Sequence, residues 1–492
     1  MMLHYQSTSN SHMIHPRTSR RSFIKGIGTI TAAGMFPNLL LSQGASKKVA
    51  LACIGVAGKG ASDASGVADK NEVVAICDVD AKSLAAAAKH YPDAKLYSDF
   101  RKMLDEVKGI EAVTISTPDH AHYPAAMHAL SHGKHIFIQK PLTNTLWECR
   151  QLHLGARKKK VITQMGNQGH TYEDNRVVAE WIAAGAIGKV KEVHVWTNRP
   201  IWPQGANVTP REIPVPDSLD WEHWLAGTPD APFIEMSADG SKPFGRRTIH
   251  PFNWRGMLEY GAGAFGDIGC HLIDAPSVAL GLGVPSFVTA TQVDDLTGVA
   301  WPTGSVVKME FPNNSHGNVS LTWYEGKKPD GTPYLPEFPS IIDLKEAFKN
   351  EKSPEKSGTV SPGGWFIVGT EGVIFNKNDQ AKEPQIWPLK RREEFLAKPT
   401  AKTLPRSVAP GNPQQEWTEA IKAGKEFASM GHFDYSCPLT ELTLIGGLAM
   451  RFPGKRLAWN SAALKVTNDE AANAFIKRKA YRKGYEYTAE SI

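Results

Sequence analysis

The segment FGDIGCHLID, residues 265–274, brings together four side chains that could do chemistry. On a helix, Asp267, His271 and Asp274 are spaced i, i+4 and i+7, which places them on one face. Two carboxylates around an imidazole, with Cys270 beside them, could bind a metal, relay a proton, or satisfy one another as buried polar groups. The segment by itself leaves all three interpretations open.

A zinc site would need ligands from outside this helix, and the sequence contains no Cys/His cluster that would supply them. The five cysteines, at positions 53, 77, 149, 270 and 437, form no C-x-x-C pair and do not suggest a disulfide framework. Cys53 and Cys77 lie in apolar runs, where cysteine packs as a small hydrophobic residue. We therefore expect no metal at this segment.

A glycine-rich turn, IGVAGKG at 54–60, closes one predicted strand and opens a helix. Glycines there allow backbone N–H groups to approach a pyrophosphate at a helix N-terminus. The predicted dinucleotide contacts in this turn are Gly55, Ala57, Gly58, Lys59 and Gly60, with Ala57 standing where glycine is usual. Asp78 ends the next predicted strand, where a carboxylate binds ribose hydroxyls and repels a 2′-phosphate. The pattern favours NAD over NADP.

The pattern of strands and helices that would position these residues changes once along the chain. Between Lys48 and Val161, short β-branched runs alternate with helical segments, which predicts a doubly wound parallel sheet. From Lys189 on, strands follow one another without helices between them. We predict an α/β fold with an N-terminal Rossmann domain at 46–165. A second α/β domain, with a large open and mostly antiparallel sheet, would occupy 166–492, and its C-terminal helices could pack back on the first domain.

The N-terminal segment indicates export. SRRSFIKG at 19–26, with paired Arg20 and Arg21, precedes a modestly apolar stretch at 27–41 that is too short for a stable membrane span. This pattern resembles a twin-arginine signal, with a basic disordered N-terminus as the alternative. We expect a signal peptide at 1–45, recognition by the twin-arginine translocase, a protein that is periplasmic or otherwise exported by this pathway, and no membrane span after cleavage.

Charge outside this leader is nearly balanced. The chain has 56 Lys and Arg against 50 Asp and Glu, and residues 1–45 hold four of those cations and no acid. Short basic runs elsewhere are typical of solvated helix faces. We therefore expect no nucleic-acid partner.

The segment STPDHAHYPAAMHALSHGKHIFIQKPLT, 116–143, resembles the glucose–fructose oxidoreductase / inositol dehydrogenase (Gfo/Idh/MocA) family. Members show Thr-Pro-x-x-x-His, then Gly-Lys-His and Glu-Lys-Pro. The resemblance continues through NQGH (167–170), GAIGKV (185–190), LDWEHWL (219–225), FNWRG (252–256) and GDIGCHLID. Together with RPIWPQG (199–205), the later segments resemble an exported bacterial branch of that family.

The resemblance implies hydride transfer between NAD and a sugar or cyclitol, with Lys140, Asp267 and His271 converging on the nicotinamide. His271 would take the hydroxyl proton, Asp267 would orient it, and Lys140 would hold the developing oxyanion. Asp274 would be a structural anchor. Further cofactor contacts implied are Thr117, Pro118, His122, Gln139, Lys140 and Asn167. Provisional substrate contacts are His170, Trp202, Trp254 and Arg255. The family also implies a homo-oligomer, a dimer or tetramer.

Two features depart from the family pattern or fall outside its site. Gln139 stands where most members have Glu; its amide could still hydrogen-bond a ribose, but it removes a negative charge beside Lys140. We expected this loss to make the lysine easier to deprotonate. The remaining histidines of this segment, His128, His132 and His135, are expected to be surface or packing residues.

Export restricts the reaction, because the periplasm has no established pool of free NAD. A cofactor loaded inside the cell and never released suits a sugar oxidoreductase in which a second substrate or an external carrier reoxidises it. It also suits an NAD-dependent glycosidase, which oxidises a hydroxyl, eliminates the aglycone, adds water and reduces the ketone again. A secreted carbohydrate-binding protein without catalysis is the non-enzymatic alternative.

Overall fold

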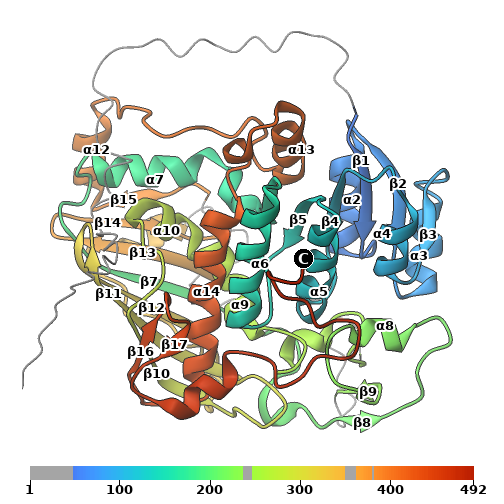
Figure 1. The fold of residues 1–492 in the computed structure, drawn as a ribbon. Coiled ribbons are helices and arrows are strands. Elements are labelled where there is room, and N and C mark those ends of the chain that lie inside the picture. Colours follow the sequence, from blue (N-terminus) through green and yellow to red (C-terminus); the bar gives the residue numbers. More distant parts are fainter. Residues whose placement is uncertain (1–47, 237–246, 349–361, 379–381) are drawn as a thin grey trace, which may run out of the picture. The chain divides into compact units, whose positions relative to one another are not determined.

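The computed structural model describes residues 48–236, 247–348, 362–378 and 382–492, and the predicted signal peptide lies outside these ranges. Its first sheet has six parallel strands in the order β3-β2-β1-β4-β5-β6 (Figure 1). The strands are β1 (Ala50–Ile54), β2 (Glu72–Cys77), β3 (Lys95–Tyr97), β4 (Ala112–Ile115), β5 (His135–Gln139) and β6 (Thr163–Gly166). The order reverses between β1 and β4, and the carboxyl ends of strands at such a point open into a ligand crevice.

Five helices connect these strands. They are α2 (Lys59–Ala68), α3 (Ala81–Ala88), α4 (Phe100–Glu106), α5 (Asp119–Ser131) and α6 (Leu146–Lys159). Side-chain caps fix several of their starts: Asp80 and Asp99 cap α3 and α4, and Thr145 forms a capping box with Glu148 at α6. β4 is buried along its whole length, as expected of a central parallel strand covered on both faces.

The second sheet has nine strands in the order β15-β14-β13-β7-β12-β11-β10-β16-β17. Its described pairings are antiparallel except that of β7 with β12. The strands are β7 (Val190–Thr197), β10 (Phe287–Asp294), β11 (Gly304–Asn314), β12 (Gly317–Gly326), β13 (Gly363–Gly369), β14 (Val373–Asn376), β15 (Gln385–Trp387), β16 (Leu457–Asn460) and β17 (Lys465–Val466). The predicted fold class, a doubly wound sheet followed by a large mostly antiparallel sheet, is confirmed.

Helices α7 (Glu173–Ala183), α9 (Gly263–Leu272), α10 (Asp274–Leu280) and α14 (Phe433–Met450) lie together beside the second sheet (Figure 1). The FGDIGCHLID segment is therefore helical, mostly in α9. α9 packs between α14 and strands β7 and β13. The approach to α14 is close, because a Cβ at Gly446 of α14 would collide with the Phe265 ring of α9. This packing fixes the position of every polar side chain on α9.

The C-terminal helices contact both sheets. α14 packs on β10 and β11 of the second sheet and on α6 and β6 of the first. α13 (Pro413–Ala423) packs on α2, β5 and β6. In that contact Trp417, fully buried, lies 5.8 Å from the Phe137 ring and donates to the Ile162 carbonyl at 3.2 Å. The first domain is thus held in part by a helix from the C-terminal part of the chain.

The remaining described elements are short. They are α8 (Trp221–Leu225), α11 (Leu344–Phe348), α12 (Leu389–Leu396), β8 (Arg211–Glu212), β9 (Ile234–Glu235), and the 3-10 helices η1 (Gln168–Thr171), η2 (Gly205–Asn207), η4 (Asn253–Gly256), η5 (Glu426–Ala428) and η6 (Glu470–Phe475). All five cysteines are buried and free. Among the helices described, none has the length and apolar character that crossing a membrane requires.

Candidate active site

A cavity of about 540 Å³ opens at the carboxyl ends of the parallel strands, where the strand order reverses. Its walls come from the glycine turn after β1, the end of β2, the segments after β4 and β5, and residues 250–267. The predicted site residues that line it are Gly55, Ala57, Gly58, Lys59, Asp78, Thr117, Pro118, His122, Gln139, Lys140, Trp254, Arg255 and Asp267. Gly60, Asn167, His170, Trp202 and His271 are not among its lining residues.

The glycine turn has the form that a pyrophosphate requires. Gly55 has φ +77°, and a Cβ there would lie 2.7 Å from the Ser116 carbonyl oxygen. Gly58 has φ +53° and open space where its Cβ would stand. No side chain caps the N-terminus of α2, so its first turn can present N–H groups to an anion, apart from those of Gly60 and Ser62, which donate to the Ala57 and Gly58 carbonyls. The residues present therefore fit a dinucleotide.

Asp78 connects the end of β2 to this turn. Its Oδ2 accepts the Val56 N–H at 2.9 Å, and its Oδ1 accepts the Asp80 N–H at 3.0 Å. Burial raises the pKa of the carboxyl, which these two N–H donors partly offset. Each oxygen keeps a further lone pair toward the cavity, so the predicted ribose contact is compatible with the geometry.

Gln139 has a different partner from the one expected. Its amide nitrogen donates to Asp63 Oδ2 at 2.8 Å, and the fully buried Asp63 also accepts from Ser116 Oγ at 2.8 Å and Gln414 Nε2 at 2.5 Å. Lys59 forms an ion pair with the same carboxylate. The Gln139 amide nitrogen thus has a partner in Asp63, a residue that sequence reasoning missed, and the ribose contact expected of the same amide stays a prediction. A glutamate at 139 would instead place a second carboxylate against Asp63.

Lys140 and Arg255 share one buried carboxylate. The Nζ of Lys140 lies 2.7 Å from Asp267 Oδ1, and the Nε of Arg255 lies 3.3 Å from the same oxygen. Burial alone would raise the pKa of Asp267, but the two cations together lower it below its ordinary value. The Arg255 guanidinium also stacks 4.3 Å from the Trp254 ring. Lys140 therefore has a carboxylate partner although residue 139 is not acidic.

His271 is oriented by Asn167, not by Asp267 as predicted. Asn167 Nδ2 donates to the Cys270 carbonyl at 2.7 Å, which turns its Oδ1 toward His271 Nδ1 at 2.9 Å. Because an amide oxygen only accepts, Nδ1 of His271 carries the hydrogen and Nε2 keeps a lone pair. Burial and the charge of Lys140 lower the pKa of His271 to about 3, so the ring is neutral. The two cations hold Asp267, and this is why the predicted pairing along α9 does not form.

Asp119, which the sequence analysis did not single out, lies in the same cavity. It is the first residue of α5 and only 3% exposed, and its Oδ2 accepts the Ala262 N–H at 3.0 Å. Burial raises the pKa of Asp119 to about 7, against the opposing charge of Lys140. A carboxyl that titrates near neutrality can give or take a proton at physiological pH. Its position after Thr117-Pro118, at a helix N-terminus, was the available signal.

His122 was predicted to contact the nicotinamide ribose, and the structure gives both ring nitrogens other neighbours. Nδ1 lies 2.8 Å from the Pro141 carbonyl and Nε2 lies 2.9 Å from the Thr117 carbonyl. Burial lowers the pKa of the ring to about 4. His122 therefore braces the segment after β4 against the segment after Lys140, and it faces the cavity through its carbon edge.

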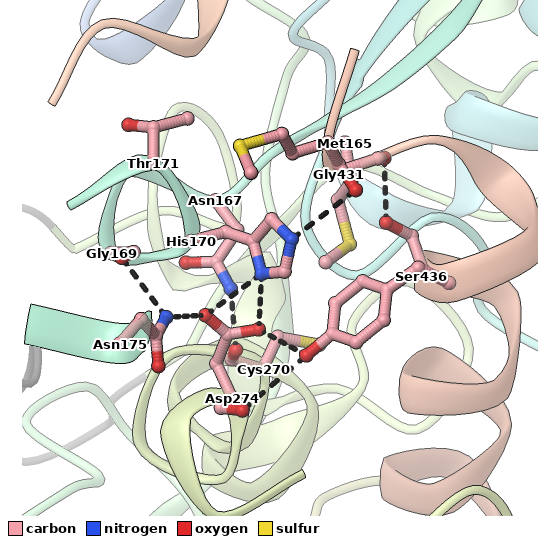
Figure 2. A network of polar contacts seen from close by, with 12 residues as sticks. Met165, Asn167, Gly169, His170, Thr171, Asn175, Cys270, Asp274, Gly431 and Ser436 are labelled. Carbon is pink, nitrogen blue, oxygen red and sulfur yellow. Dashed lines mark hydrogen bonds and ion pairs between the residues drawn. The ribbon is translucent and has the colours of Figure 1, made fainter. Parts of the chain in front are cut away.

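His170 belongs to a separate buried network around Asp274. His170 Nδ1 lies 2.9 Å from Asp274 Oδ1, and Asn175 Nδ2 and Tyr435 OH each reach this carboxylate at 2.5 Å. Figure 2 shows His170 and Asn175 both pointing at Asp274. His170 does not line the main cavity and borders a second cavity of about 430 Å³. His170 thus joins η1 to α10, and its predicted substrate contact stays a prediction.

Trp202 also lies outside the main cavity. It is buried, its Nε1 donates to Gln204 Oε1 at 2.6 Å, and its ring meets Phe252 edge-on at 6.0 Å. Phe252 lines the cavity, so Trp202 supports the wall from behind. Of the two tryptophans proposed for substrate, only Trp254 lines the cavity.

The four side chains of FGDIGCHLID therefore diverge. Asp267 faces Lys140 and Arg255, His271 faces Asn167, and Asp274 faces the His170 network. Cys270 Sγ lies 4.0 Å from Thr443 Oγ1, and burial raises its pKa to about 12. A protonated thiol is not a metal ligand. The geometry favours proton chemistry at Lys140 and His271 over zinc binding by this helix.

Gln139→Glu is expected to lower the free energy of unfolding, and more at about pH 8 than at about pH 5. The new carboxyl would be buried beside Asp63, which puts its folded-state pKa above its unfolded value. Stability is then lost as the pH rises above the unfolded pKa, because the unfolded chain releases the proton more readily. Urea unfolding at the two pH values measures the effect.

The control is a double-mutant cycle with Asp63→Asn. Without the Asp63 charge, the pH-dependent part of the Gln139→Glu loss should largely disappear. A loss of the same size in both backgrounds would show that repulsion between the two carboxyls is not its cause.

Sequence profiles of known families match both parts of the chain. A profile described as "Oxidoreductase family, NAD-binding Rossmann fold" matches residues 48–167. The profile of the GFO/IDH/MocA C-terminal domain matches residues 233–333. The Rossmann profile thus precedes the C-terminal profile, which is the domain order that the sequence analysis predicts.

Curated relatives match parts of the chain. Inositol 2-dehydrogenase of Salmonella typhimurium is 32% identical over 125 residues, which are 25% of this chain and 37% of that protein. Glycosyl hydrolase family 109 protein 1 of Shewanella sp. (strain MR-4) is 28% identical over 211 residues, 36% of this chain and 45% of that protein. Levoglucosan dehydrogenase of Pseudarthrobacter phenanthrenivorans is 25% identical over 313 residues, which are 57% of this chain and 69% of that protein. The chain thus spans less than half the length of the first two.

A solved structure supports the fold. This structure is the WlbA dehydrogenase of Bordetella pertussis in complex with NADH and UDP-GlcNAcA. It superposes on this chain with a TM-score of 0.54 at 15% sequence identity. The superposition covers 84% of this chain and 99% of that one. Likeness at this identity shows the fold. With both domain profiles matching in order, the chain belongs to the Gfo/Idh/MocA family, and its first domain is an NAD-binding Rossmann domain.

Proposed function

We propose that the protein is an NAD-dependent oxidoreductase that oxidises a hydroxyl of a sugar, glycoside or cyclitol. The observation that carries the proposal is the ion pair of Lys140 and Asp267 in the cavity that the glycine turn opens, with His271, on the same helix as Asp267, outside the lining. A cation held by a buried carboxylate lies close enough to a neutral imidazole to lower its pKa. Inositol 2-dehydrogenase and levoglucosan dehydrogenase, by their names, act on a cyclitol and on an anhydrosugar.

Each residue has a part in the proposed oxidation. NAD, bound by the glycine turn and Asp78, would supply the hydride acceptor. Nε2 of His271, free of hydrogen because of Asn167, takes the hydroxyl proton. The Lys140 ammonium donates to the same oxygen as negative charge develops on it. Arg255 and Lys140 share the Asp267 carboxylate, which keeps the ammonium in place. His271 with so low a pKa is a weak base, so the oxygen must be acidified by Lys140.

The proposal includes export and a retained cofactor. Its support is the leader sequence, in which Arg20 and Arg21 precede a short apolar stretch. The twin-arginine pathway carries folded proteins, so NAD bound in the cytoplasm would travel with the protein. Reoxidation would then depend on a second substrate or an external electron carrier.

A redox-neutral glycosidase is the second candidate, and Asp119 favours it. Elimination and hydration need a group that moves protons beyond the one taken from the hydroxyl, and Asp119 lines the cavity with a pKa of about 7. The likeness to a glycosyl hydrolase family 109 protein also supports this candidate.

Absorbance of bound nicotinamide during turnover distinguishes the candidates. The purified protein is mixed with a chromogenic glycoside or a free sugar, and reduction is followed together with aglycone release. Lasting reduction by free sugar supports the oxidoreductase. Transient reduction with aglycone release supports the glycosidase, and its rate should fall in Asp119→Asn. Protein that binds no nicotinamide would contradict both.

His271→Ala is expected to lower turnover about 10²–10⁴-fold, because the proton acceptor is lost. Lys140→Met should cause a loss of similar size, and the double variant should be little worse than either, since the residues act on one oxygen. Asn167→Ala should lower kcat through loss of the required tautomer, while Asn167→Asp, which keeps an acceptor, should recover part of it. Steady-state kinetics of these five variants, each compared with wild type, measures the losses in kcat.

His170→Asn serves as the matched control. Because His170 belongs to the Asp274 network, its replacement should lower the melting temperature, whereas His271→Ala should leave stability and cofactor content nearly unchanged. Full activity in His271→Ala would eliminate the proposed proton transfer.

Asp78→Asn is expected to weaken NAD binding and relatively improve NADP binding, because repulsion of the 2′-phosphate is lost. Asparagine keeps an acceptor for the Val56 N–H, which limits damage to the glycine turn. Fluorescence titration with both cofactors gives the ratio of dissociation constants. An unchanged ratio would assign the choice between NAD and NADP to another group.

A further inference from the structure

Two histidines and a carboxylate converge on the surface of the first domain, away from the cavity. His128 lies in the last turn of α5, His132 is its C-cap, and Asp105 lies on the neighbouring helix α4 (Figure 1). Asp105 Oδ1 lies 3.0 Å from His132 Nε2 and 3.3 Å from His128 Nε2. Within the described ranges, these three form the one His/Cys/Asp/Glu group whose ligand atoms all lie within 4.8 Å. Sequence reasoning had assigned both histidines to surface or packing roles.

One of the two ring nitrogens of His128 lacks a well-formed hydrogen bond. Its Nε2 is buried and, among the described residues, makes no hydrogen bond despite lying 3.3 Å from the carboxylate. Its Nδ1 lies 3.0 Å from the Tyr487 hydroxyl. A buried ring nitrogen without a donor or acceptor is costly. It would be satisfied by an ion bound between the three side chains.

The two separations from Asp105 Oδ1 match the distance between neighbouring ligand atoms of a tetrahedral site. Imidazole nitrogens and carboxylate oxygens lie about 2.0–2.2 Å from zinc, which places neighbouring ligand atoms about 3.3 Å apart. The separations of Asp105 Oδ1 from His132 Nε2 and His128 Nε2, 3.0 and 3.3 Å, are close to that distance. Histidines at i and i+4 of a helix present their rings on one face, as such a site requires. Only small side-chain adjustments would be needed.

The surroundings of His128 also suit a ligand. When Nε2 binds a metal, Nδ1 carries the hydrogen and can donate to Tyr487 OH, the usual outer contact of a ligating histidine. Tyr487 is itself held where its carbonyl accepts the Tyr123 hydroxyl at 2.7 Å.

We propose that Asp105, His128 and His132 form a structural zinc site, with water in the fourth position. Bound zinc joins α4 to α5 and, through Tyr487, fixes the C-terminal segment against α5. Nitrogen ligands select zinc over calcium, which takes an all-oxygen shell. The proposal is independent of the proposed oxidoreductase activity.

Zinc titration of the full chain after chelator treatment tests the proposal. By calorimetry near neutral pH, wild type should show one zinc site per chain that is lost in His132→Gln, whose side chain is partly exposed and can be replaced without unfolding. Asp105→Asn should weaken this site at least about tenfold, as should loss of the outer contact in Tyr487→Phe. Zinc should raise the melting temperature of wild type and not of His132→Gln, and calcium should do neither.

His90→Gln, an exposed histidine after α3, is the matched control and should bind zinc as wild type does. The comparison between variants also removes any contribution of His4, His12 and His15 in the leader. Equal zinc binding by wild type, His132→Gln and Asp105→Asn would overturn the proposal, as would an absence of this site in wild type. In either case the three side chains form only a surface ion pair.

Discussion

The ion pair between Lys140 and Asp267 is the constraint on which the candidate site depends. Both side chains are largely removed from water, and a charge in such a place is stable only beside an opposite one. Lys140 directly follows β5 of the parallel sheet, whereas Asp267 stands on α9, which packs against the second sheet. One interaction therefore fixes the reacting ammonium and joins the two sheets. Arg255, the second cation on Asp267, extends the same link to the wall formed by residues 250–256.

At the dinucleotide end of the cavity, Asp63 is likewise a buried carboxylate that its neighbours must stabilise. One fully buried carboxylate is surrounded by donors from four parts of the chain: Lys59 on α2, Ser116 after β4, Gln139 on β5 and Gln414 on α13. Because a buried charge needs all its lone pairs satisfied, each donor also fixes its own element. The glycine turn is consequently coupled to a helix near the C-terminus, and the replacement of Glu by Gln at 139 becomes a requirement of this cluster.

Sequence reasoning reached the fold and the site region because both depend on local patterns. Alternation of apolar runs with helices predicted the parallel sheet, and the glycine turn with Asp78 located the cavity. The partners of individual side chains were less predictable. Asp267 and His271 share a helix face, but two cations from distant segments compete for the carboxylate, and Asn167 takes the imidazole. His170 and Trp202 sit in family-like motifs, yet packing turns both away from the cavity. Asp63 gave no local pattern that singled it out, and the signal for Asp119 was its position after Thr117-Pro118 at the start of a helix.

Two pairs of side chains that could bind a metal, Asp267 with His271 and His128 with His132, are each spaced i and i+4. We expect metal binding only at the second pair, and the neighbouring charges explain the difference. On α9, Asp267 contacts Lys140, and burial together with the positive charge of Lys140 lowers the pKa of His271, so the imidazole is neutral and a metal ion beside it would be repelled. On α5, His128 and His132 face the carboxylate of Asp105, which favours a cation between them. The same helical geometry is thus proposed to serve proton transfer in one place and metal binding in the other. The sign of the charge that the tertiary structure brings to each helix decides between them.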